Sequence, residues 1–290
     1  MRRINFQALL GAAVIAVSAL TASSCATDTI VNSAANTVSA IGKATESITP
    51  EQEYYIGRAV AGTILENYKV YNNAVTQTYL NKICHAIAVN SDRPELYKGY
   101  YVAILDSDEV NALSTSGGHI LVTRGLLDCA LSEDALAAVI AHELAHIHLQ
   151  HSIKAIKSSR ATEAIKSTAG TVALAVTSGS ETTVELVSAF DETVGDVVSQ
   201  LVTSGYSQSQ EFDADKYALQ LMAQAGYKPE AMQDMLTVLN SKSTSSSSGF
   251  GKTHPTPQKR LDNLNKEYGK YSVADTTAAR TARFQNNRLK

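Results

Sequence analysis

Apolar residues recur at three- and four-residue spacing along most of the chain, and this spacing predicts helices. Near Pro50 a helix is expected to begin after a polar capping residue. The apolar stripe of this first helix is Ile56, Val60 and Ile64, and that of the next is Val75, Tyr79, Leu80, Ile83 and Ile87. A long helix is predicted from about Ser132 to His151, and further helices over 160–203, 206–225 and 229–240.

Between Gly99 and Val122 the pattern changes to short β-like runs at 101–105 and 119–122, broken by Gly117-Gly118. These runs predict a small sheet. The pattern as a whole therefore predicts a mainly helical α+β fold, in which a small sheet lies beside the long helix. A serine-rich stretch, 241–251, is predicted to be a loop, and 272–290 reads as a polar tail.

The first residues have the order of a secretory signal. Arg2 and Arg3 precede about a dozen apolar residues, too few to span a bilayer, and small residues then lead to Cys25. We interpret 1–24 as a signal peptide and 25–50 as a flexible tether. Cys25 resembles the acylated cysteine of bacterial lipoproteins, although cleavage by an ordinary signal peptidase is the alternative. The expected location is the periplasm or cell envelope, with a lipid anchor at Cys25 in the outer membrane.

Composition narrows the class of protein. The chain has 290 residues, 44% of them hydrophobic, and a net charge of −3 without a basic cluster beside aromatic residues, so nucleic acid is not an expected partner. The segment 152–205 carries many charged residues and cannot span a membrane. In an oxidising compartment Cys84 and Cys129 could form a disulfide or remain two buried thiols.

The strongest chemical signal is His142-Glu143-Leu144-Ala145-His146 within the long predicted helix. Residues four apart share a helix face, so both imidazoles can reach one metal ion. Glu143 is turned away from that line, where its carboxylate can contact a water on the metal. The alternative is a surface helix with two incidental histidines.

A catalytic zinc needs a third protein ligand and one open position for water. Glu211 and Asp215 lie four apart on a predicted helix, so the glutamate can bind the metal while the aspartate hydrogen-bonds to a ligand histidine. Taken alone, such a pair is more typical of a solvated helix face; together with His142 and His146 it favours a three-ligand site.

These motifs resemble the gluzincin metallopeptidases of the CAAX prenyl protease and HtpX family, in its soluble exported bacterial branch. The resemblance covers roughly 51–265 and rests on several strings. They are 51–57, Asn111-Ala112-Leu113 with Gly117-Gly118-His119-Ile120, His142 to His146 with His151-Ser152, Glu211 to Asp215, Gly226-Tyr227-Lys228-Pro229, and His254-Pro255 with Arg260. It implies a zincin fold over 51–271 and one Zn²⁺ per chain, held by His142, His146 and Glu211.

The resemblance also implies roles for residues outside the ligand set. The Gly-Gly turn leads into an edge strand that pairs with substrate, so Gly118, His119 and Ile120 are expected to bind substrate. His254 is expected to approach the metal or to bind the developing oxyanion, and Arg260 to pair with Asp215. His148 and His151 are interpreted as structural or solvent-facing.

The predicted function is zinc-dependent cleavage of misfolded or misassembled envelope polypeptides, with Glu143 as the general base. The alternative is a periplasmic chaperone or assembly factor for outer-membrane proteins that keeps a latent protease. A deformylase-like hydrolase is disfavoured, because neither Cys84 nor Cys129 stands in the context that a cysteine ligand would need.

Overall fold

The computed structural model describes residues 48–155, 197–243, 253–254 and 257–289, all of which fall within one compact unit of the chain. Several predictions concern residues outside these ranges. They are the signal peptide at 1–24 with Cys25, nearly all of the tether, most of the helix predicted at 160–203 and most of the serine-rich loop. Within the described residues the fold is mainly helical with one small sheet, which confirms the predicted class.

The first two helices follow the apolar stripes of the sequence. Helix α3, Pro50–Asn67, begins with Thr49 as N-cap in a capping box, and helix α4, Ala74–Ala88, begins with Asn73 as N-cap. Val75 was predicted to be buried but is 60% exposed. Thr76 takes the buried position instead, because its hydroxyl donates a hydrogen bond to the Asn287 carbonyl.

The sheet has three strands in the order β1-β3-β2, where β1 is Tyr101–Leu105, β2 is Ala112–Thr115 and β3 is His119–Thr123. Strand β3 runs parallel to β1 and antiparallel to β2. The prediction that His119 begins an edge strand is therefore wrong. The preceding run at 112–115, too short to be recognised from its pattern, forms a strand and places β3 in the centre.

The two outer edges of the sheet differ. Along β1, side-chain amides of α4 replace a neighbouring strand, because Asn81 and Gln77 accept from the amides of Val102 and Ile104 and both donate to the Val102 carbonyl. On β2, the amide of Thr123 donates to the Asn111 carbonyl, and the alternation of an antiparallel ladder then turns the backbone groups of residues 112 and 114 away from β3.

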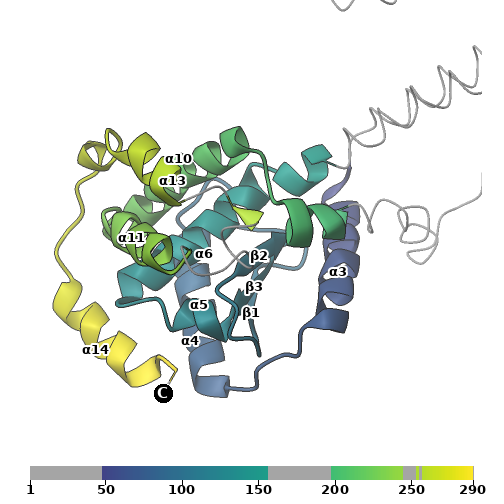
Figure 1. Ribbon diagram of the computed structural model, residues 1–290, viewed down its shortest axis with the longest axis horizontal. Coiled ribbons are helices and arrows are strands. Elements are labelled where there is room, and N and C mark those ends of the chain that lie inside the picture. Colours follow the sequence, from purple (N-terminus) through teal and green to yellow (C-terminus); the bar gives the residue numbers. More distant parts are fainter. Residues whose placement is uncertain (1–47, 156–196, 244–252, 255–256, 290) are drawn as a thin grey trace, which may run out of the picture. The chain divides into compact units, whose positions relative to one another are not determined.

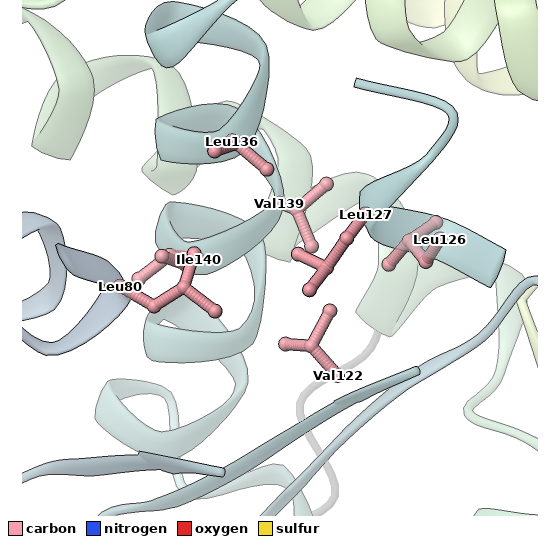
Figure 2. A pocket seen from close by; sticks show the side chains of 7 residues that line it. All are labelled: Leu80, Val122, Leu126, Leu127, Leu136, Val139 and Ile140. Carbon is pink, nitrogen blue, oxygen red and sulfur yellow. The ribbon is translucent and has the colours of Figure 1, made fainter. Parts of the chain in front are cut away.

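Helix α6, Glu133–His148, begins at the N-cap Ser132 and is buried along its whole length. The predicted helix continued to His151, but α6 ends at His148 because Gln150 has a φ of 54° and interrupts the backbone pattern. One face of α6 packs on the sheet side of the core. Figure 2 shows Leu136, Val139 and Ile140 directed at side chains of α4, β3 and the short helix α5, Arg124–Leu127, around a small apolar pocket.

The remaining elements come from the C-terminal half of the chain. They are η1 Gln200–Ser204, α10 Gln208–Gln224, α11 Ala231–Ser243, α13 Pro257–Leu264, η2 Tyr268–Lys270 and α14 Thr277–Asn287. Helix α6 contacts α4, α10, α11 and β2, so it is the common neighbour of these elements (Figure 1). None of the helices in the described ranges combines the length and apolar character that a bilayer span requires.

The C-terminal segment corrects a prediction. Residues 272–290 were expected to be a polar tail, yet α14 packs against α4 and α6 and buries Arg280 and Phe284. These two residues lie four apart and share a helix face, and the charge of Arg280 is accommodated by a buried ion pair with Asp134. Cys84 and Cys129 are buried free thiols, so of the two alternatives the disulfide is excluded.

Candidate active site

Four side chains from three separate segments converge beside the C-terminal half of α6. His142 and His146 come from α6, Glu211 from the first turn of α10, and His254 from the described pair 253–254. One ligand atom from each lies within 4.8 Å of all the others, and all four residues are buried. The structure thus brings the three predicted ligands together and adds His254 to their group.

The distances within this group suit a small cation. The two histidine Nε2 atoms are 3.1 Å apart, and the Glu211 oxygens lie 3.4 Å from His142 Nε2 and 3.3 Å from His146 Nε2. A tetrahedral zinc with bonds of about 2.0 to 2.1 Å separates its ligand atoms by about 3.3 Å. His254 Nδ1 is 2.8 Å from Glu211 Oε2. The donors are therefore already spaced as a metal site requires.

Two buried carboxylate oxygens also call for a cation. Oε1 of Glu143 and Oε1 of Glu211 have no hydrogen-bond donor among the described residues, although both side chains are almost fully buried. A buried carboxylate oxygen without a donor is costly. Glu143 Oε1 lies 3.9 Å from His254 Nε2, at the border of the group. The residues present fit a metal ion, with Glu143 beside it.

His142 is held by charged partners. Its Nδ1 lies 3.0 Å from Asp215 Oδ1, and Arg260 of α13 donates to both oxygens of the same aspartate. Burial and Arg260 would lower the pKa of His142, but hydrogen bonds to Asp215 and Glu211 outweigh them and raise it to about 9. The structure thus contains the two expected contacts, that of Arg260 with Asp215 and that of Asp215 with a histidine of the donor group.

His146 has neutral partners instead, and the sequence interpretation missed both. His151 Nδ1 lies 2.9 Å from His146 Nδ1, and the ring of Tyr206 stacks on His146 with centroids 4.2 Å apart and planes 17° apart. Burial lowers the pKa of His146. His151 was assigned a structural or solvent-facing role because three ligands were already assigned, and on a continuous helix residues five apart would not face each other. Nothing in the pattern revealed the interruption at Gln150.

The residues expected to bind substrate lie in the central strand of the sheet and in the turn before it. Gly118, His119 and Ile120 belong to the β2–β3 turn and the central strand, and none of them lines the small pockets that touch Glu143. One of these pockets is lined by Ala112, Leu113 and Ser114 of β2 together with Tyr206 and His254, among others. The strand whose edge lies beside the four donor side chains is therefore β2.

A second pocket also includes Glu143 in its lining. Its lining is apolar apart from three site residues and includes Met232, Met235, Leu236 and Leu239 of α11. Both His142 and Glu143 contribute to it. Glu143 thus lines both an apolar pocket and the pocket that includes β2.

Comparison with known proteins gives a consistent result. The family described as Peptidase family M48 matches residues 74–268. The beta-barrel assembly-enhancing protease of Yersinia pestis is 23% identical over 251 residues, which cover 85% of this chain and 49% of that protein.

Two proteins of Escherichia coli strain K12 are also similar. Its beta-barrel assembly-enhancing protease is 23% identical over 72% of this chain and 41% of that protein, and its metalloprotease LoiP is 28% identical over 64% of this chain and 68% of that protein. The chain thus spans less than half the length of the two assembly-enhancing proteases.

Proposed function

Because the chain belongs to peptidase family M48, we propose that it is a zinc-dependent endopeptidase of the bacterial cell envelope that cleaves unfolded or misassembled polypeptides. The observation that carries this proposal is the buried group of four donor atoms within 4.8 Å, with Glu143 beside it. Imidazole nitrogens with one carboxylate form a donor set that suits zinc. We propose His142, His146 and Glu211 as the ligands of one ion per chain.

The chain's own residues perform the proton transfers. When bound, zinc lowers the pKa of water to about 7 and polarises a carbonyl group. Glu143 then takes a proton from the attacking water and passes it to the leaving amine. Asp215 holds His142 through Nδ1, and Arg260 holds Asp215, so the imidazole keeps its orientation during this exchange.

His254 lies where the reaction would need a water. Its Nδ1 is 2.8 Å from Glu211 Oε2, and with one ligand atom of His254 in the donor group the chain would offer a tetrahedral metal four donors. The geometry therefore favours an approach to the metal over the other expected role, the binding of the oxyanion. Cleavage requires that His254 moves aside, and the arrangement described here is a closed one.

The substrate is proposed to pair with β2. The backbone groups of Ala112 and Ser114 face away from β3, and the Ala112 carbonyl lies 3.4 Å from His254 Nε2, so this edge is close to the donor group. Pairing through backbone groups accepts an extended peptide of almost any sequence. This selectivity for conformation rather than sequence suits the clearance of unfolded chains.

The location is proposed from the N-terminal sequence. Export by residues 1–24 and acylation of Cys25 would hold the catalytic unit at the outer membrane, on the periplasmic side. Unfolded envelope polypeptides are then the partners within reach, and nucleic acid is not.

The test compares the full-length chain with Glu143→Gln. The wild type is expected to bind one zinc and to degrade unfolded casein over time, while the variant binds zinc equally and does not cleave. Metal content is measured by atomic absorption and cleavage by gel electrophoresis. Cleavage by Glu143→Gln at the wild-type rate, or a wild-type chain without zinc, would overturn the assignment.

A second function is favoured by the closed position of His254. A protein that rests with all four metal positions filled could act mainly as an assembly factor that binds outer-membrane polypeptides, with proteolysis latent. A strain that lacks the wild-type gene separates the two functions. Rescue of its envelope defects by Glu143→Gln as complete as by the wild type would favour binding, and failure to rescue would favour cleavage.

A further inference from the structure

His151 is a buried histidine that the proposed mechanism does not use. It is 2% exposed, it is absent from the group of possible ligands, and its Nδ1 lies 2.9 Å from Nδ1 of His146. The contact therefore joins His151 to the ring nitrogen of His146 that does not face the donor group. A ring nitrogen can donate or accept, and the tautomers decide which does.

The backbone departs from a regular helix in order to make this contact. On a continuous α-helix, residues five apart are separated by about 140° around the axis, so His151 would face away from His146. The helix instead ends at His148, and Gln150 adopts a φ of 54°, a left-handed conformation unusual for a residue with a side chain. It is the one such residue other than glycine in the described ranges. A strained position kept beside a site points to a function for the residue that it places.

The direction of the hydrogen bond follows from the position of the metal group. His146 Nε2 lies 3.3 Å from Glu211 Oε1 and 3.1 Å from His142 Nε2, so Nε2 is the atom that faces the donor group. A nitrogen that binds metal carries no proton, and a neutral His146 must then carry its proton on Nδ1. That N–H has one partner at hydrogen-bond distance among the described residues, the ring nitrogen of His151.

We propose that His151 is the positioning residue of His146: its Nδ1 accepts the hydrogen bond from His146 Nδ1–H and so fixes the tautomer and ring orientation in which Nε2 binds zinc. This inference rests on the proposed function, because it needs His146 to be a ligand. His151 carries its own proton on Nε2 and stays neutral. Tyr206 completes the support by stacking on one face of His146, which opposes rotation of the ring.

The two ligand histidines are thereby supported in different ways. His142 is oriented by an aspartate that is itself paired with Arg260, whereas His146 is oriented by a neutral imidazole. A second carboxylate at the position of His151 would add negative charge to a site that already contains Glu143 and Glu211. A neutral acceptor supplies the hydrogen bond without that charge.

The test measures zinc affinity of the full-length chain by competition with a chromogenic chelator. His151→Phe keeps an aromatic ring but removes the acceptor, and zinc affinity is expected to fall roughly 10- to 100-fold. His151→Asn places its amide oxygen where Nδ1 stood and is expected to restore affinity to within about threefold of the wild type. His148→Phe is the matched control, because His148 is a buried histidine of α6 that contacts Tyr100 and Tyr217 and is not part of the donor group.

Each outcome decides the matter. Weakened binding by the Phe variant with rescue by Asn, and no loss in His148→Phe, supports the proposal. Equal affinity of His151→Phe and wild type overturns it, as does an Asn variant as weak as Phe, which would assign His151 to packing alone. If the Phe variant does not fold, as judged by circular dichroism of the metal-free chain, the Asn variant decides by the same measurement. A wild-type chain that binds no zinc fails at the earlier step, since it overturns the proposed function itself.

Discussion

The two halves of α6 both bury charged side chains, but they balance them differently. At the N-terminal end, Glu133 and Asp134 each meet an arginine from α14: Arg283 Nη2 lies 2.6 Å from Glu133 Oε1 and Arg280 Nε lies 2.8 Å from Asp134 Oδ2. Tyr79 also donates to Glu133. Each acid at this end of the helix therefore has one arginine of the chain as its partner.

The C-terminal half has more acids than permanent cations. Among the described residues Glu143, Glu211 and Asp215 gather around one arginine, Arg260, and otherwise around histidines. Glu143 and Glu211 each keep an oxygen without a donor. The difference teaches how a structural charge cluster can be told from a candidate metal site: in the first each acid has an arginine of its own, whereas in the second two carboxylate oxygens lack a donor and fit a positive ion from outside.

The largest expected effect concerns that ion. Zinc at 1,000 times its dissociation constant should stabilise the wild type by about 4 kcal/mol, because it binds the folded chain and not the unfolded one. Glu211→Gln should abolish this zinc-dependent stabilisation, since a ligand oxygen with its charge is lost. Urea unfolding with and without zinc measures both. Asp213→Asn, an exposed acid on the same helix, should retain the full effect, and retention of the effect by Glu211→Gln would remove Glu211 from the ligand set.

The second largest expected effect concerns the ion pairs at the N-terminal end of α6. Arg280 is 5% exposed at its side chain, so Arg280→Met leaves Asp134 with an uncompensated buried charge and should cost about 3 kcal/mol of unfolding free energy. Arg283 is 53% exposed but its partner Glu133 is 1% exposed, so Arg283→Met should cost about 2 kcal/mol, less than Arg280→Met because Tyr79 still donates to Glu133.

Neither arginine variant should change zinc affinity. Urea unfolding and the chelator competition give the two quantities separately. A loss of zinc affinity in Arg280→Met comparable to that of Glu211→Gln would show that the two ends of α6 are not independent.

The sequence predicted the features that appear as a regular spacing of residues along the chain. The stripes of α3 and α4, the helix that carries His142 and His146, and the pair Glu211 and Asp215 were all visible from spacing, because side chains four apart share a helix face. The charged pattern of the C-terminal residues did not predict α14, since Arg280 is buried only when Asp134 is there to receive it.

Other features depend on contacts between distant residues. The four-residue strand β2 is too short to recognise alone, and it exists through its pairing with β3, so the edge of the sheet was assigned to the wrong strand. The contact of His151 with His146 depends on one backbone angle at Gln150, which periodicity does not encode. Residue spacing thus predicted the members of the donor group that lie on helices, whereas the contacts of His151 and Tyr206 with His146 appear only in the folded chain.

The last turn of α6 contains a third kind of buried ionisable group and gives the smallest predicted effect. His148 hydrogen-bonds to the hydroxyls of Tyr100 and Tyr217, both uncharged, and burial together with Arg93 lowers its pKa from 6.5 to about 4. Between these two values the unfolded chain binds the proton and the folded chain does not. The free energy of unfolding should therefore rise with pH from about 4 to about 6.5.

This rise should amount to about 2 kcal/mol from His148. Each pH unit between the folded and unfolded pKa values contributes at most about 1.36 kcal/mol, and the residual solvation of the ring reduces the total. His148→Phe should remove that part of the slope, while contributions from other histidines are common to both chains and cancel in the difference. Urea unfolding at intervals between pH 4 and 7, with a chelator present so that zinc loss does not contribute, measures it. Identical slopes would mean that His148 is charged in the folded chain, and the last turn of α6 would then belong with the site and not with the neutral structure around it.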